Sequence, residues 1–137
     1  MVVVATALAF ALQLWPLVQA GRYPLAGYNP LMGGVRTAEY AIPLGWGDGL
    51  DVAGAHIREL AGGQPVTTAI WSPLRVSFGA HAPGPVLSER QIAEADYYVD
   101  YIHARQRRLT PRQLVSRKPT AVVTIGGVDY VRIYKLR

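Results

Sequence analysis

Residues 1–21 contain no charged side chain, whereas all 14 Lys and Arg and all 9 Asp and Glu follow them. At a rise of about 1.5 Å per residue, roughly twenty apolar residues make a helix about 30 Å long, which is the thickness of the hydrocarbon layer of a bilayer. Trp15 and Tyr23 bracket the far end of the segment, where aromatic rings favour the headgroup layer. We therefore expect a transmembrane helix over residues 1–20, with membrane lipid as a partner.

Two alternative interpretations of the leading segment stay open. A cleaved signal peptide fits the small residues Val18 and Ala20 ahead of Gly21, although no Lys or Arg precedes the apolar run. A buried core helix would normally carry a polar face, which this segment lacks. The continuous hydrophobicity favours the transmembrane interpretation.

The rest of the chain predicts a loop and one small domain. Residues 21–34 are rich in Gly, Pro and Tyr, which predicts an ordered loop. Expected helices cover residues 35–40, 50–61, 74–80, 104–109 and 111–115, and expected strands cover residues 41–44, 65–71, 86–87 and 95–102. The clearest feature is a C-terminal β-hairpin, residues 120–125 and 128–136 joined across Gly126 and Gly127. Residues 35–137 therefore predict a small α/β sandwich with a mixed sheet.

The composition argues against several kinds of site. The chain has no cysteine, which rules out disulfides, cysteine nucleophiles and thiolate metal sites. His56, His81 and His103 lack the spacing of metal ligands, and no serine stands in a nucleophile-elbow motif. The basic residues behind the net charge of +5 are dispersed, apart from a basic flank that is typical of a solvated face. This flank consists of Arg105, Arg107, Arg108, Arg112, Arg117 and Lys118. We expect no metal, no cofactor and no nucleic-acid partner.

Residues 45–51, GWGDGLD, predict a glycine-rich turn that leads into a helix, with Asp48 as its N-cap. Gly45 and Gly47 match two glycines of the dinucleotide-binding fingerprint, but Leu50 stands where that fingerprint requires a third glycine. A structural corner is the better interpretation. Asp48 and Asp51 are three residues apart and face the same way on a helical turn, which suits acid–base chemistry or a cation. Acids at a helix start also favour the helix dipole without any further role.

Several segments, in this order, resemble the C-terminal part of bacterial GT-C membrane glycosyltransferases. They are residues 28–34 (YNPLMGG), 45–51 (GWGDGLD), 95–99 (ADYYV) and 127–134 (GVDYVRIY). The pattern is similar to that of the dolichyl-phosphate-mannose–protein mannosyltransferases and of lipid A aminoarabinose transferase. In that family a last membrane helix enters a tyrosine- and glycine-rich loop, and a glycine turn then opens a soluble α/β domain outside the membrane. Asp48 stands where the family pattern has Glu.

The resemblance implies a part of a larger enzyme that transfers a sugar from a polyprenyl-phosphate donor to an acceptor. The catalytic acid of the family lies in a loop among N-terminal helices, so no residue of this sequence inherits a catalytic role. The resemblance therefore implies an accessory, extracytoplasmic domain that is inactive alone. A membrane-tethered or secreted binding domain without catalytic activity is the alternative. The residues expected to contact ligand are Tyr28, Asn29, Trp46, Asp48 and Asp51.

Overall fold

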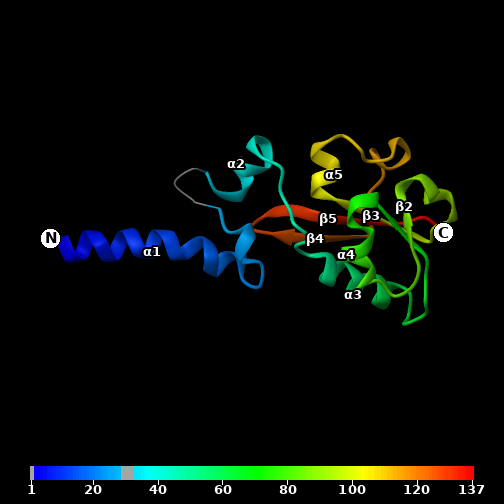
Figure 1. Ribbon diagram of the computed structural model, residues 1–137, viewed down its shortest axis with the longest axis horizontal. Helices are drawn as coiled ribbons and strands as arrows, with labels where there is room; N and C mark the ends of the chain where they lie inside the picture. The colour runs from blue at the N-terminus through cyan, green and yellow to red at the C-terminus, as the bar shows by residue number, and fades with distance from the viewer. Residues whose placement is uncertain (1, 29–32) are drawn as a thin grey trace.

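The computed structural model describes residues 2–28 and 33–137 of the chain (Figure 1). The α-helices are α1 (Val2–Ala20), α2 (Gly34–Ala41), α3 (Leu50–Leu60), α4 (Arg75–Gly79) and α5 (Ile102–Gln106). The strands are β1 (Thr68–Ile70), β2 (Val86–Ser88), β3 (Tyr97–Tyr101), β4 (Ala121–Ile125) and β5 (Val128–Lys135). Short 3-10 helices are η1 (Pro24–Ala26), η3 (Ser72–Leu74), η4 (Glu89–Glu94) and η5 (Arg112–Leu114).

The five strands form one mixed sheet in the order β2-β1-β3-β5-β4. β1 runs parallel to β2 and β3, whereas β5 runs antiparallel to β3 and β4. The parallel pairs are connected through α4 and η4, because strands that run the same way need a crossover. The α/β class with a mixed sheet is confirmed, and β4 and β5 form a C-terminal hairpin where the sequence predicts one.

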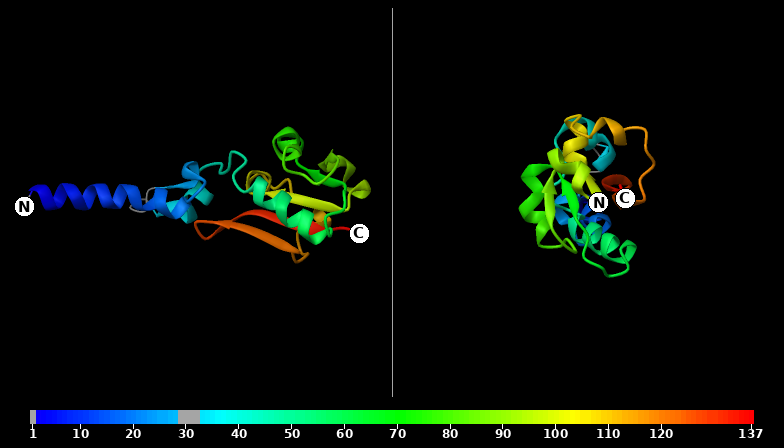
Figure 2. Two further views of the ribbon diagram at one scale, coloured as in Figure 1. Left: turned by 90° about the horizontal axis from the view of Figure 1, so that it is seen from below. Right: turned by 90° about the vertical axis from the view of Figure 1, so that its right-hand side faces the viewer.

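Helices and connecting segments lie on both sides of the sheet (Figure 2). The two faces of the sheet carry different side chains. Successive residues of β3 point to opposite faces, so Val99 and Tyr101 lie in the larger core and Tyr98 lies in a smaller one. The larger core is covered by α3 and by Phe78 of α4. The smaller core is closed by residues from η4 and η5 and by Leu136 near the C-terminus. Because β3 is buried on both faces, all five of its residues are buried.

Helix α3 packs on the sheet through Leu50, Ala53 and Ile57, which recur at helical spacing and are fully buried. Gly54 lies on the same buried side and faces the end of α4. A Cβ atom at this position would come within 2.3 Å of the His81 carbonyl oxygen, so only glycine allows the two helices to approach this closely.

The segment between α2 and the glycine turn is held by one side chain of α5. Gln106 Nε2 donates to the carbonyl oxygens of Glu39 at 2.6 Å and Ile42 at 3.0 Å, and its Oε1 accepts from Leu44 N at 2.8 Å. The predicted strand over residues 41–44 is wrong, since α2 continues to Ala41 and the residues after it join no strand. The side chain of Gln106 supplies the hydrogen bonds that a neighbouring strand would otherwise provide.

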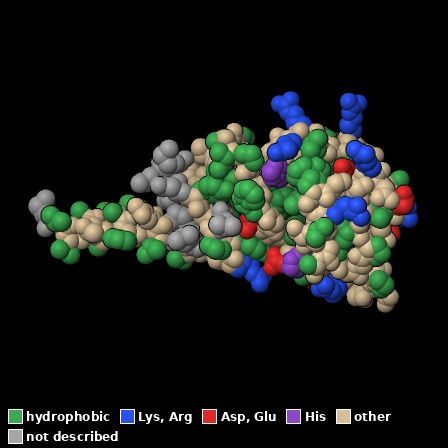
Figure 3. Space-filling view, viewed as in Figure 1, with side chains coloured by type: hydrophobic (Ala, Val, Ile, Leu, Met, Phe, Trp, Pro, Cys, Tyr) green, Lys and Arg blue, Asp and Glu red, His purple; other side chains and the backbone are tan. Residues whose placement is uncertain are grey.

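Helix α1 extends away from the sheet domain, and its described large apolar side chains are exposed (Figures 1 and 3). Val3 is 81% exposed and Phe10 is 64% exposed. Its contacts with the rest of the chain are mainly with η1. The segment is therefore helical, as expected, but it is not a core helix buried in this domain.

Among residues 2–28 and 33–137, no helix combines the length and the apolar character that crossing a bilayer requires. The transmembrane helix expected over residues 1–20 is therefore a wrong prediction. The helix that forms is 19 residues long, and Thr6, Gln13 and Gln19 divide its sequence into short apolar runs. A span normally needs about 20 predominantly apolar residues.

The close approach of α3 and α4 generates a test. We expect Gly54→Ala to lower the free energy of unfolding by about 2 kcal/mol, because the added methyl group meets a backbone carbonyl, even though alanine favours a helix. Gly79→Ala is the matched control, since no atom lies within 4 Å of the Cβ position there. Urea unfolding of both variants measures the difference, and equal stability would show that the helix contact tolerates a methyl group.

Candidate ligand-binding site

The glycine turn between α2 and α3 holds its residues in a fixed arrangement. Gly45, Gly47 and Gly49 have φ values of 88°, 103° and 81°, which lie in the left-handed region that favours glycine. The Gly47 N–H donates to the Tyr101 hydroxyl at 2.9 Å, and the Trp46 N–H donates to Asp48 Oδ2 at 3.3 Å. Both bonds tie the backbone of the turn to side chains beside it.

Gly45 lies directly against the ring of Tyr101. A Cβ atom at position 45 would come within 2.4 Å of the Tyr101 hydroxyl oxygen, so any other residue would displace the turn from the sheet. Tyr101 itself is fully buried at the end of β3. Trp46 consequently extends from a turn that is anchored on both sides, and its side chain remains 82% exposed.

Tyr28 and Tyr130 complete the site, since the charge of Asp48 acts on both of them. Tyr130 is fully buried, and its hydroxyl has no hydrogen-bond partner among the residues that the structure describes. Burial raises the pKa of Tyr130, and the charge of Asp48 acts in the same direction. Burial also raises the pKa of half-buried Tyr28, again assisted by Asp48. We call Tyr28, Trp46, Asp48, Tyr101 and Tyr130 the turn site.

A β-bulge directs Tyr130 into the turn site. Val123 pairs with Val131, whereas Thr124 pairs with Asp129, so Tyr130 is an extra residue in β5. Tyr130 and Val131 both lie in the larger core, although neighbouring residues of a regular strand would point to opposite faces. Without the bulge, Tyr130 would point to the same face of the sheet as Tyr134, which lies in the smaller core.

Asp51 makes its contacts away from Asp48. Its Oδ1 accepts from the Tyr23 hydroxyl at 2.5 Å, and its Oδ2 lies 3.3 Å from Arg22 Nη1. Partial burial opposes ionisation of Asp51, but the Tyr23 hydrogen bond and the Arg22 charge bring its pKa below the ordinary value. Burial and the hydrogen bond to Asp51 raise the pKa of Tyr23 to about 12. Asp51 therefore joins the start of α3 to the segment that follows α1.

The structure thus brings together three of the five residues that the sequence singles out. Tyr28, Trp46 and Asp48 belong to the turn site, Asp51 has separate partners, and Asn29 lies outside the described residues. Asp48 does not cap α3, because Gly49 occupies the N-cap position. No local sequence signal identifies Tyr101 and Tyr130 as residues of the site, because they lie in β3 and β5, far from the turn in sequence.

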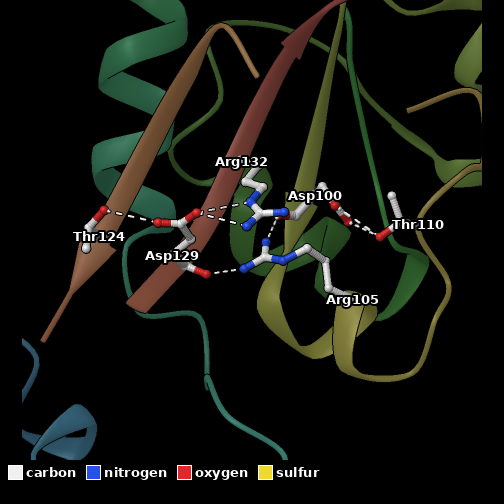
Figure 4. Close-up of polar contacts among 6 residues, drawn as sticks. All are labelled: Asp100, Arg105, Thr110, Thr124, Asp129 and Arg132. Carbon is white, nitrogen blue, oxygen red and sulfur yellow. Dashed lines mark hydrogen bonds and ion pairs between the residues drawn. The ribbon is translucent and has the colours of Figure 1, made fainter. Parts of the chain in front are cut away.

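A second polar cluster lies on the opposite face of the sheet (Figure 4). Asp100 is fully buried, and both of its carboxylate oxygens accept from the Thr110 hydroxyl at 3.1 Å. Arg105 Nη1 donates to the Asp100 carbonyl oxygen at 2.7 Å, and its Nη2 donates to the carbonyl oxygen of Asp129. Arg132 binds the Asp129 carboxylate through Nε and Nη2 at 3.1 and 3.0 Å. The cluster therefore joins β3, α5 and β5.

Burial raises the pKa of Asp100 to about 6, although the charge of Arg105 and the Thr110 hydrogen bond act in the opposite direction. Burial likewise lowers the pKa of Arg105. Because these groups bond to one another and Asp100 is enclosed, the cluster serves packing and not ligand contact. Within residues 2–28 and 33–137, no group of three or more acids or histidines is gathered closely enough to hold a metal ion.

Tyr101 and Tyr130 offer a matched pair for testing the turn site. We expect Tyr101→Phe to lower the free energy of unfolding by about 1 kcal/mol, because the Gly47 N–H loses its acceptor. Tyr130→Phe should leave stability unchanged or raise it, since the hydroxyl that it removes has no described partner. Chemical denaturation gives both values, and hydrogen exchange at the Gly47 amide should accelerate in the first variant alone.

The buried carboxylate of Asp100 predicts a pH dependence of stability. Its folded pKa of about 6 exceeds its unfolded value of 3.8, so the protonated form stabilises the fold below about pH 4, and this contribution is lost as the pH rises through 6. Asp100→Asn should remove this loss, and its stability relative to wild type should rise by roughly 2–3 kcal/mol between pH 4 and pH 7. Asp129→Asn is the control, because its carboxylate is partly exposed. An unchanged difference across this range for Asp100→Asn would show that Asp100 titrates normally.

Comparison of the chain with known proteins gave no matching family model, no similar curated protein and no similar solved structure.

Proposed function

We propose that this chain is an accessory domain of a glycosyltransferase that takes its sugar from a polyprenyl-phosphate donor, and that it acts at the extracytoplasmic side of a membrane. The observation that carries the proposal is the exposed Trp46 on a glycine turn that is hydrogen-bonded to Tyr101, with Asp48 bonded to the Trp46 backbone and its charge acting on Tyr28. The turn is also one of the segments whose sequence resembles the C-terminal part of GT-C enzymes. The resemblance and the geometry therefore point to the same residues.

The side chains of the turn site suit contact with a sugar. A pyranose ring has one face of C–H groups, which packs on the flat apolar face of an aromatic ring, and its rim carries hydroxyl groups. The Asp48 carboxylate can accept hydrogen bonds from such hydroxyls, and the half-buried Tyr28 hydroxyl can donate or accept. Binding sites commonly combine apolar surface with a few fixed polar groups in this way. Tyr101 and Tyr130 are fully buried, so they support the turn site from the core and do not contact a ligand.

The contacts of the carboxylates favour an accessory role over a catalytic one. Glycosyl chemistry uses carboxylates that can reach the reacting sugar and exchange protons with it. The Asp51 carboxylate is hydrogen-bonded to Tyr23 and paired with Arg22, and Asp100 is fully buried on the other face of the sheet. Asp48 remains half-exposed at the turn site, where it is placed to orient a hydroxyl. We therefore assign to this chain a binding contribution and to the rest of the enzyme the transfer step.

The proposal is tested with Trp46→Ala in membranes from cells in which the variant replaces the wild-type chain. We expect glycosyl transfer from a polyprenyl-phosphate sugar to fall roughly two- to tenfold in kcat/KM, because an aromatic contact is worth roughly 0.5–1.5 kcal/mol beyond the area that it buries. Tyr40→Ala is the matched control, since Tyr40 is an aromatic residue with 89% exposure outside the turn.

Equal activity of the two variants at equal expression would contradict a role of Trp46 in transfer. If Trp46→Ala abolished saccharide binding by the purified chain and left transfer unchanged, the alternative of a binding domain without an enzyme would be supported. A Trp71→Ala variant adds a structural reference, because Trp71 packs against His103 at a ring-centre distance of 5.3 Å.

A further inference from the structure

The segment between Asp100 and Asp129 contains no acidic residue, although it carries six Lys and Arg. Five of these cations are exposed: Arg107, Arg108, Arg112, Arg117 and Lys118. We call residues 102–120 the basic segment. Blue side chains project from the upper edge of the domain above α5 in Figure 3, where this segment runs.

The fold explains why the cations point outward. Ile102, Ala104 and Leu114 are buried and fix α5 and η5 against the sheet, and Arg105 reaches inward to the polar cluster. The residues between these anchors consequently face away from the domain. Arg108, two residues after the end of α5, has a φ of 57°, and this left-handed conformation turns the chain away from the helix axis. The residues that follow it include the exposed Arg112, Arg117 and Lys118.

Three of the cations have no internal partner. No described residue forms a hydrogen bond or an ion pair with the side chains of Arg108, Arg112 or Lys118. Arg107 lies over the Trp71 ring at 5.7 Å, and Arg117 Nη2 donates to the Lys135 carbonyl oxygen at 2.5 Å. Since the basic segment contains no acid and its side chains form no ion pair with a described residue, this surface carries an excess of positive charge.

Apolar side chains are interspersed with the cations. Val115 is 71% exposed and Leu109 is 45% exposed. A shallow pocket of about 290 Å³ lies beside η5, where Leu114 and Leu136 line it together with Arg117 and Arg137. A surface that combines free cations with exposed aliphatic groups matches a ligand that is anionic and amphiphilic.

We infer that the basic segment binds the anionic headgroups of a lipid surface, with Val115 and Leu109 entering the headgroup layer. Nucleic acid is the other large polyanion, but its single strands are bound by aromatic side chains that stack on bases. The basic segment contains no Phe, Trp or Tyr, and the neighbouring Trp71 ring is already in contact with Arg107 and His103. Its helices, of five and three residues, are also too short to read a major groove. Lipid headgroups require only charge and a few apolar contacts.

The strength of this binding follows from the number of free cations. Each Lys or Arg near an anionic membrane contributes roughly a fivefold increase in partitioning, so removal of three cations should weaken it by on the order of a hundredfold. Salt should weaken it as well, since the Debye length falls from about 8 Å at 0.15 M to about 3 Å at 1 M. Helix α1 has no charge, so its contribution to vesicle binding should respond to neither change.

The experiment measures co-sedimentation of the whole chain with vesicles of phosphatidylcholine, with and without phosphatidylglycerol. The test variant carries Arg108→Gln, Arg112→Gln and Lys118→Gln. The matched control removes the same charge elsewhere, through Arg36→Gln, Arg58→Gln and Arg90→Gln, which are all exposed residues outside the basic segment. We expect wild type and control to prefer the anionic vesicles at moderate salt and the test variant to lose most of this preference.

Three results would overturn the inference. Equal binding of wild type to neutral and anionic vesicles would assign the association to apolar contacts. An equal loss in the two triple variants would assign it to net charge and not to this surface. Tighter binding of a single-stranded oligonucleotide than of anionic vesicles, lost only in the test variant, would identify nucleic acid as the partner. None of these results depends on glycosyl transfer.

Discussion

The contact between Gly45 and Tyr101 is the constraint on which the turn site depends. Tyr101 ends the central strand β3, and its ring occupies the space that a side chain at position 45 would need. The Tyr101 hydroxyl also accepts a hydrogen bond from the Gly47 N–H. Tyr101 therefore both requires glycine at position 45 and stabilises the observed conformation of the turn. The exposed position of Trp46 follows from these two contacts. A flexible loop would present the same side chain with a larger loss of conformational entropy on binding.

The sheet separates apolar packing from polar packing. Its α3 side is a continuous apolar core that ends in the tyrosines of the turn site. Its other side contains a smaller apolar core and the cluster of Asp100, Arg105 and Arg132. A buried charged cluster of this kind contributes little net stability but permits few alternative arrangements, because each unpaired member would be costly. It therefore fixes the position of α5 on the sheet.

Local sequence signals predicted the elements that depend on local physics. The hairpin followed from two apolar runs across Gly126 and Gly127, and α3 followed from helical spacing that two glycines end. Three features depend on residues distant in sequence and escaped prediction: the bond from Gln106 to residues 39–44, the bulge at Tyr130 and the burial of Asp100. The transmembrane prediction over residues 1–20 was wrong as well, since no helix of the described residues has the length and apolar character that crossing a bilayer requires. At the turn site, Trp46 and Asp48 were accessible to sequence reasoning, whereas their supporting tyrosines were not.

The bonds of Gln106 have a mechanical consequence. One amide group holds two carbonyls and one N–H of the segment that leads into Gly45, and it belongs to the short helix from which the basic segment continues. Rotation of α5 would have to carry residues 39–44 with it or break all three bonds together. The orientation of α5 and the placement of the glycine turn are therefore coupled, so that a movement of the basic segment would be transmitted to the turn site.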